Sequence, residues 1–241
     1  VMSMTLPTSL LGHGEPFTYI RGSQTEAKGE LELEQWTTAR IGKEGGRYLG
    51  LDFNTELEYG VTDRFQVAGY VNYNYHYLDG AVGSSRTYDD LNRFQFNGGS
   101  VELKYQFLSA TKDPIGLALY VEPGYATVKT RSGQSTDEWE LDCKIIVQKN
   151  FFDNRLITAF NYVIEPEWER DGSDWETALN MEWVAGASYR LSDRWYLGLE
   201  TRLSTEFEDA DLDESEYLTL FLGPTLHYER DKWTATLTVL P

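Results

Sequence analysis

The chain has 241 residues, a formal net charge of −18 at pH 7 and a mean hydropathy of −0.47. This acidic balance argues against a nucleic-acid partner, which requires a basic surface, and no apolar run reaches the roughly 20 residues of a spanning helix. A transmembrane β-barrel stays compatible with low hydropathy because its lumen is polar, and the aromatic content of 14% suits the aromatic girdles of such a barrel.

The N-terminal residues 1–14 have the features of a signal-peptide remnant. An apolar stretch ends at Leu11, and glycines flank His13 in the pattern of small residues before a signal-peptidase site. A disordered N-terminal arm is the alternative interpretation. Residues 15–27 then form a connecting segment, which we expect either in the periplasm or in the lumen of a barrel.

The clearest strand pattern covers residues 48–77 and follows a first expected strand at residues 28–40. Up to Tyr59, apolar residues occupy the odd positions and polar residues the even ones, and the alternation resumes after a turn at residues 62–64. Successive side chains of a strand point to opposite faces, so this stretch is a β-hairpin with one apolar and one polar face. Each arm is longer than the usual strand of roughly five or six residues.

Eight further segments alternate in the same way, at residues 93–107, 115–125, 138–148, 156–164, 175–189, 195–207, 218–228 and 233–239, which brings the expected number of strands to eleven. The parity breaks at Phe94 and Phe96, which indicates a bulge or inward-facing rings. Short turns with a repeated signature, such as Thr62-Asp63-Arg64-Phe65 and Ser192-Asp193-Arg194-Trp195, alternate with longer loops. Bacterial outer-membrane barrels have such short turns on the periplasmic side and longer loops outside.

A twelfth strand is expected because these barrels usually have an even number of strands and an open sheet edge is unfavourable in lipid. Either the region around Phe17 supplies it, or it lies outside this sequence; we favour the second because the chain stops abruptly at Pro241. The sequence therefore predicts an all-β, antiparallel up-and-down transmembrane barrel over residues 28–241, with about twelve strands when complete.

The polar faces are assigned to the lumen and the apolar faces to lipid. The strands are too long for a soluble sandwich, and acids interspersed with lysine and arginine suit a solvated lumen. The predicted lumen-lining residues are Asp52, Glu56, Glu58, His76, Glu102, Lys104, Glu140, Asp142, Lys144, Glu182, Arg190, Glu200 and Arg202. The predicted aromatic residues of the lipid interface are Trp36, Tyr59, Phe65, Tyr105, Trp139, Trp175, Tyr189, Trp195, Phe207, Tyr228 and Trp233.

Two stretches carry a resemblance to a known group of proteins: Leu31-Glu32-Leu33-Glu34-Gln35-Trp36 and the run from Leu57 to Gln66, LEYGVTDRFQ. They resemble uncharacterised Gram-negative outer-membrane β-barrels, related to the barrels of the phenol-degradation MetA pathway. The resemblance extends from about Phe17 onward. It implies an outer-membrane location, contact with lipid and lipopolysaccharide, and a closing strand beyond Pro241, and it supplies no catalytic residue.

Rings of acids in a pore favour cations over anions. We therefore expect a narrow passive channel for small solutes with a preference for cations. The first alternative is a non-conducting structural or interaction barrel that binds a surface partner or lipopolysaccharide, which a lumen blocked by the residues after Phe17 would favour. The oligomeric state stays open.

An outer-membrane hydrolase is a remote alternative, since His76 could act with Ser84 or Ser85 and with Asp79. The expectation is nevertheless no enzyme and no catalytic residue. The acidic loop at residues 208–214 has the initial spacing of an EF-hand but lacks its glycine and its final glutamate, so no metal site is predicted. No cofactor is expected.

Overall fold

The computed structural model describes residues 2–5, 8–9, 14–83, 86–209, 212, 215–230 and 233–241. Its strands are β1 (Met2–Thr5), β2 (Thr8–Ser9), β3 (Leu31–Ile41), β4 (Gly45–Thr62), β5 (Phe65–Gly83), β6 (Arg86–Thr87), β7 (Leu91–Leu108), β8 (Gly116–Val128), β9 (Ser135–Phe151), β10 (Leu156–Asp171), β11 (Asp174–Arg190), β12 (Trp195–Glu208), β13 (Ser215–Arg230) and β14 (Trp233–Leu240). In the described residues, no helix is both long enough and apolar enough to cross a membrane.

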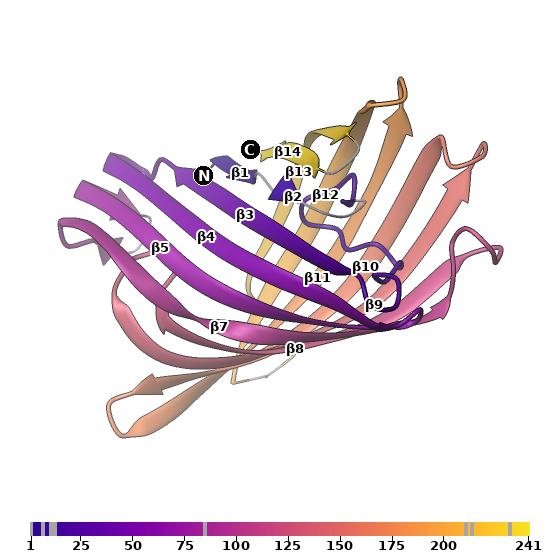
Figure 1. The fold of residues 1–241 in the computed structure, drawn as a ribbon. Helices are drawn as coiled ribbons and strands as arrows, with labels where there is room; N and C mark the ends of the chain where they lie inside the picture. The colour runs from indigo at the N-terminus through magenta and orange to yellow at the C-terminus, as the bar shows by residue number, and fades with distance from the viewer. Residues whose placement is uncertain are drawn as a thin grey trace.

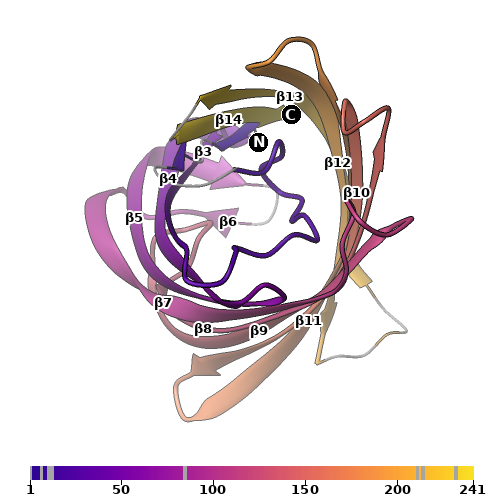
Figure 2. The same cartoon turned by 45° about the vertical axis from the view of Figure 1, so that its right-hand side comes forward.

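One antiparallel sheet contains all of these strands, and each long strand pairs with the next long strand along the chain (Figure 1). The eleven wall strands, β3 to β5 and β7 to β14, curl through 307° into a nearly closed barrel. This confirms the predicted all-β, up-and-down architecture and its eleven strands. Figure 2 shows the strands around an interior that an N-terminal coil enters.

The short strands β1 and β2 lie at the seam between β14 and β3 and pair with both. Ser3 of β1, for example, is opposite Leu240 of β14 and Arg40 of β3. These two short strands occupy the place of a twelfth strand. The hypothesis that the Phe17 region supplies that strand is wrong, because Phe17 lies buried inside the barrel.

The predicted leader overlaps these two strands. Residues 1, 6–7 and 10–13 of it lie outside the described residues. The leader itself, and a closing strand beyond Pro241, stay predictions.

The side chains of the wall sort by parity, with polar groups inside and apolar groups outside. In β4, Glu56 is 0% and Glu58 8% exposed, whereas Leu57 is 51% and Tyr59 42% exposed. A soluble barrel would place the apolar face inward, since burial of apolar surface stabilises a fold by about 25 cal/mol per Å². The outer surface of this barrel therefore fits an apolar environment.

A bulge in β7 explains the break in parity. The pairing of β5 with β7 shifts so that Asn97 and Gly98 lie opposite the single residue Asn72. Before the bulge, the outward residues have even numbers, and Phe96 is 57% exposed. After it, the outward residues have odd numbers, and Val101 is 53% exposed. The rings of Phe94 and Phe96 therefore face outward, and the bulge that follows them in β7 explains the change of parity.

We predict that Gly98→Ala destabilises the barrel. Gly98 has a φ of 75°, and a Cβ there would lie 1.9 Å from the carbonyl oxygen of Tyr125. A left-handed backbone conformation alone costs a non-glycine residue about 1–2 kcal/mol. Guanidinium unfolding followed by tryptophan fluorescence should show at least this loss. The control is Gly69→Ala, where no described atom lies within 4 Å; equal midpoints for the two variants would contradict the prediction.

Candidate functional site

Residues 14–28, which we call the inner segment, run as an irregular coil through the barrel interior (Figure 2). Phe17 and Ile20 are 1% and 0% exposed and pack on apolar side chains of β10 and β11. They are an apolar anchor in a lumen that is otherwise mostly polar. The expected connecting segment 15–27 therefore lies in the lumen and not in the periplasm.

Glu200 of β12 holds the start of the inner segment. The backbone amides of Thr18 and Tyr19 donate hydrogen bonds to its two carboxylate oxygens, both at 2.9 Å. The hydroxyl groups of Thr225 and Thr238, from β13 and β14, donate to the same carboxylate at 2.7 Å. Glu200 is 1% exposed, and these donors replace the water that a buried carboxylate loses.

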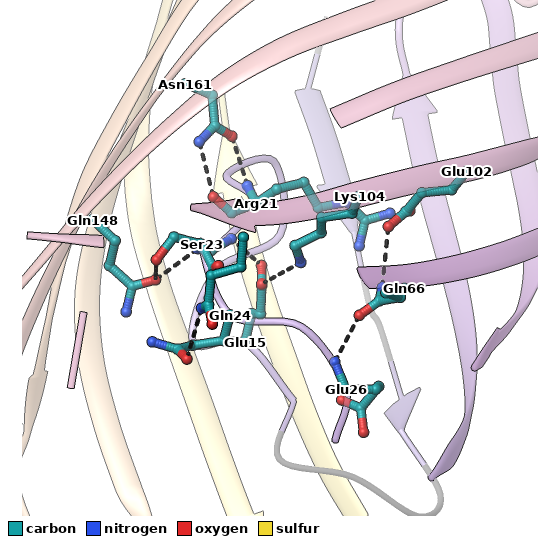
Figure 3. Close-up of polar contacts among 12 residues, drawn as sticks. Glu15, Arg21, Ser23, Gln24, Glu26, Gln66, Glu102, Lys104, Gln148 and Asn161 are labelled. Atoms are coloured by element: carbon teal, nitrogen blue, oxygen red, sulfur yellow. Dashed lines mark hydrogen bonds and ion pairs between the residues drawn. The ribbon is translucent and has the colours of Figure 1, made fainter. Parts of the chain in front are cut away.

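Side-chain amides of the wall hold the middle of the inner segment (Figure 3). Arg21 N donates to Asn161 Oδ1 at 2.7 Å, and Asn161 Nδ2 donates back to Arg21 O at 2.8 Å. Ser23 N donates to Gln148 Oε1, and Ser23 O accepts from Gln106 Nε2, both at 2.8 Å. Irregular backbone inside a protein needs such partners, because an unpaired buried amide or carbonyl is costly.

The Arg21 guanidinium is the main positive charge that the inner segment brings into the lumen. It lies 3.3 Å from Glu56 and 3.9 Å from Glu34, and it donates to the hydroxyl of Tyr70 at 2.7 Å. It also stacks over the ring of Trp36, 4.6 Å from its centroid. An arginine stays charged in proteins, so it compensates acids that are buried on the wall.

Trp36 corrects one predicted residue of the lipid interface. Its indole Nε1 donates to Glu56 Oε2 at 2.8 Å, inside the barrel. The physical reason is its parity, since Trp36 shares the inward face of β3 with Glu32 and Glu34. A tryptophan needs a partner for its N–H, and Glu56 provides one there.

The other ten predicted interface aromatics are exposed or half-buried. At the short-turn end of the barrel, Trp195, Tyr228 and Trp233 form a chain of ring contacts with centroid separations of 4.7 and 5.1 Å. Tyr125 and Trp139 are 4.9 Å apart near the opposite end.

All thirteen predicted lumen residues occupy inward positions, and the structure buries seven of them: Glu56, Glu58, His76, Glu102, Lys104, Glu182 and Glu200. The other six are half-buried: Asp52, Glu140, Asp142, Lys144, Arg190 and Arg202. Three ion pairs join predicted residues to other residues of the wall: Arg202 with Glu182, Lys144 with Asp142, and Arg40 with Asp52. Two more join them to the inner segment: Glu56 with Arg21, and Lys104 with Glu15. Much of the lumen charge is therefore compensated locally.

His76 is not brought into a hydrolase-like arrangement with described residues. Its Nε2 lies 3.0 Å from the carbonyl oxygen of Thr130, and its Nδ1 has no hydrogen-bond partner among the described atoms. Ser84 and Ser85 lie outside the described residues. The hydrolase stays an untested hypothesis.

Two of the cavities that the described residues line lie toward opposite ends of the barrel. The turn-side chamber, about 430 Å³, is lined by Glu26, Glu32, Glu58 and Lys104 among others. The loop-side cavity, about 270 Å³, is lined by the acids Glu167, Glu169, Glu176, Glu206, Glu208 and Asp209 with Thr177 and Ala178. Of the acidic loop that borders it, residues 210, 211, 213 and 214 lie outside the described part.

Several side chains inside the barrel are fully buried. Phe17 and Ile20 from the inner segment and Tyr120 and Glu102 from the wall are at most 1% exposed. The described part of the inner segment thus lines the turn-side chamber, and the acidic loop-side cavity is lined by wall residues alone.

The sequence pattern of a protein family matches residues 12–241, and that family is described as a family of unknown function, DUF6662. The chain belongs to this family. Among curated proteins, none matches the chain. Membership in DUF6662 therefore adds no ligand or reaction to what the geometry shows.

We predict that Arg21→Met lowers the free energy of unfolding by about 3–5 kcal/mol, because it leaves the buried carboxylates of Glu34 and Glu56 uncompensated. Guanidinium unfolding followed by tryptophan fluorescence measures the loss. The control is Arg47→Met: Arg47 pairs with Asp79 on the surface and its side chain is 72% exposed, so its loss should cost less than about 1 kcal/mol. Similar costs for both variants would refute a central role of Arg21.

Proposed function

We propose that the protein is a β-barrel of the bacterial outer membrane, in contact with lipid and lipopolysaccharide. The support is the outward apolar face of nearly every wall strand, together with the rings near the strand ends. The resemblance to uncharacterised Gram-negative outer-membrane barrels, a group related to the barrels of the MetA pathway, favours the same location.

The membrane proposal predicts the cost of a charge on the outer face. Leu199, 50% exposed near the middle of β12, is expected to contact lipid, so Leu199→Arg should destabilise the barrel in lipid vesicles by about 2–4 kcal/mol. Asp193→Arg in the adjoining turn places the same charge in water and should cost less than about 1 kcal/mol. Urea titration in vesicles compares the two; equal stability would count against lipid contact at Leu199.

Within that barrel, we propose a narrow passage for small solutes that prefers cations and that the inner segment closes at rest. The observation that carries this proposal is the inner segment in the lumen, where Phe17 and Ile20 are buried against the wall. The loop-side cavity is lined by six acids and no basic residue among those described. Acids in a pore mouth concentrate cations and repel anions.

Conductance across planar bilayers tests the passage. Gly186→Val is designed to displace the inner segment, because a Cβ at this position would lie 2.4 Å from Ile20 Cδ1 and 3.2 Å from Phe17 Cε1. We expect almost no conductance from the unchanged protein and a clear conductance from this variant. Its reversal potential should lie close to the equilibrium potential of the cation. Gly69→Val, on the outer face with no described atom within 4 Å, is the matched control.

A permanently closed structural or interaction barrel is the second candidate. The density of hydrogen bonds between the inner segment and the wall favours it, since these bonds come from β5, β7, β9, β10 and β12. Silence of Gly186→Val in a folded barrel would select this candidate, and an anion preference would contradict the role given to the acids.

A further inference from the structure

The loop between β8 and β9, residues 129–134, contacts distant strands of the wall, and we call it the strap. Along the sheet, β3 is the fourth strand from β8 in one direction, after β7, β5 and β4. In the other direction β13 is the fourth strand from β9, after β10, β11 and β12. Arg40 of β3 donates to the carbonyl oxygen of Thr130 at 3.3 Å, and Arg131 donates to the hydroxyl of Tyr217 on β13 at 3.1 Å. The strap and these two arginines therefore bridge the bore.

On the side toward β4, β5 and β7, the strap packs on the wall. His76 is 0% exposed, and its Nε2 donates to the carbonyl oxygen of Thr130 at 3.0 Å. Gly133 has a φ of 71°, and a Cβ there would lie 2.5 Å from Leu91 Cδ2 and 2.7 Å from His76 Cγ. Leu91 in turn packs on a buried apolar cluster of β4 and β5. This half of the strap is therefore held in close contact with the barrel.

On the other side, the strap is attached at two points of the wall that flank the acidic loop-side cavity. Lys129 forms an ion pair with Glu169 of β10. The hydroxyl of Tyr217, which accepts from Arg131, is itself hydrogen-bonded to Glu206 of β12. Glu169 and Glu206 both line the cavity, whose volume is about 270 Å³. The cavity thus lies along the wall between the two attachments of the strap.

The attachment at Tyr217 is weaker than the one at His76. The strap is buried at Ser132 and Gly133, whereas Arg131 is exposed. The Arg131 guanidinium makes one hydrogen bond to Tyr217 and lies 5.3 Å from the centroid of its ring. Exposed polar contacts contribute little free energy because water competes for them. The strap can therefore release Tyr217 while its buried part stays in place.

We propose that Arg131, bound to Tyr217, holds the strap as a barrier beside the acidic loop-side cavity and so limits the entry of small solutes from the loop side. Release of Arg131 widens the way to the acids of β10, β11 and β12, which attract cations. The inference rests on the proposed passage, because it names the residue that limits entry to that passage. The barrier itself can be measured without any conductance.

Thiol labelling of the cavity in the full-length protein tests the barrier. Cys143→Ala removes the one cysteine of the chain, and Ala178→Cys places a thiol in the cavity. The probes are two methanethiosulfonate reagents, one with a cationic trimethylammonium group and one with an anionic sulfonate group. We expect Arg131→Ala to accelerate labelling by both probes at least about threefold, the shift that the loss of one exposed hydrogen bond produces.

Two further variants separate the barrier from a simple effect of charge. Arg170→Ala removes an exposed arginine that pairs with Asp137 and should leave both labelling rates unchanged. Tyr217→Ala keeps the charge of Arg131 but removes its partner, and should accelerate both probes as Arg131→Ala does. If Arg131→Ala accelerates the cationic probe and slows the anionic one, Arg131 acts only through its charge and the proposed barrier is wrong. Unchanged rates in Arg131→Ala would also overturn it.

Conductance across planar bilayers distinguishes a wrong barrier from a wrong passage. In the background of Gly186→Val, Arg131→Ala should raise the conductance further, because the entry on the loop side is wider. Faster labelling in a barrel that never conducts would confirm the barrier and contradict the passage. A conductance of Gly186→Val that Arg131→Ala leaves unchanged would overturn the role of the strap at the entry.

Discussion

The outward apolar faces impose one constraint on the whole molecule: every polar group that the wall turns inward must find its partner inside the barrel. Backbone hydrogen bonds of the strands are satisfied by the sheet, but the inward side chains include many carboxylates. Local ion pairs such as Arg202 with Glu182 provide some of these partners. The inner segment provides others, because its backbone amides donate hydrogen bonds to wall residues. The inner segment is thus a set of donors and one arginine placed where the wall has an excess of acceptors.

The wall could be predicted from the sequence because its information is local. Alternation with period two, turn signatures and strand length act over a few residues, and they defined eleven strands before any contact was known. The one misplaced aromatic, Trp36, follows the parity of Glu32 and Glu34, which the alternation itself contains. Its indole ring suggested a place at the lipid interface, whereas its even-numbered position on β3 places the side chain in the lumen.

The interior could be predicted only in part. That acids such as Glu56 and Glu102 line the lumen follows from parity, but their partners come from distant segments, and Arg21 is 35 residues away from Glu56 along the chain. No spacing rule relates such residues. A signal was nevertheless present, because facing acids on adjacent strands, such as Glu34 and Glu56, require a positive charge from elsewhere in the chain.

Glu200 has a consequence for the order in which the chain can assemble. Its carboxylate joins the inner segment to threonines of β13 and β14, so residues near the beginning of the chain and residues near its end share one acceptor. Contacts between such distant residues form late, because closing a long loop costs entropy before the contact returns any stabilisation. The carboxylate of Glu200 lacks several of its hydrogen-bond donors until the inner segment and strands β13 and β14 have all reached it. Closure of the barrel wall and insertion of the inner segment into the lumen therefore belong to one cooperative step at the end of folding.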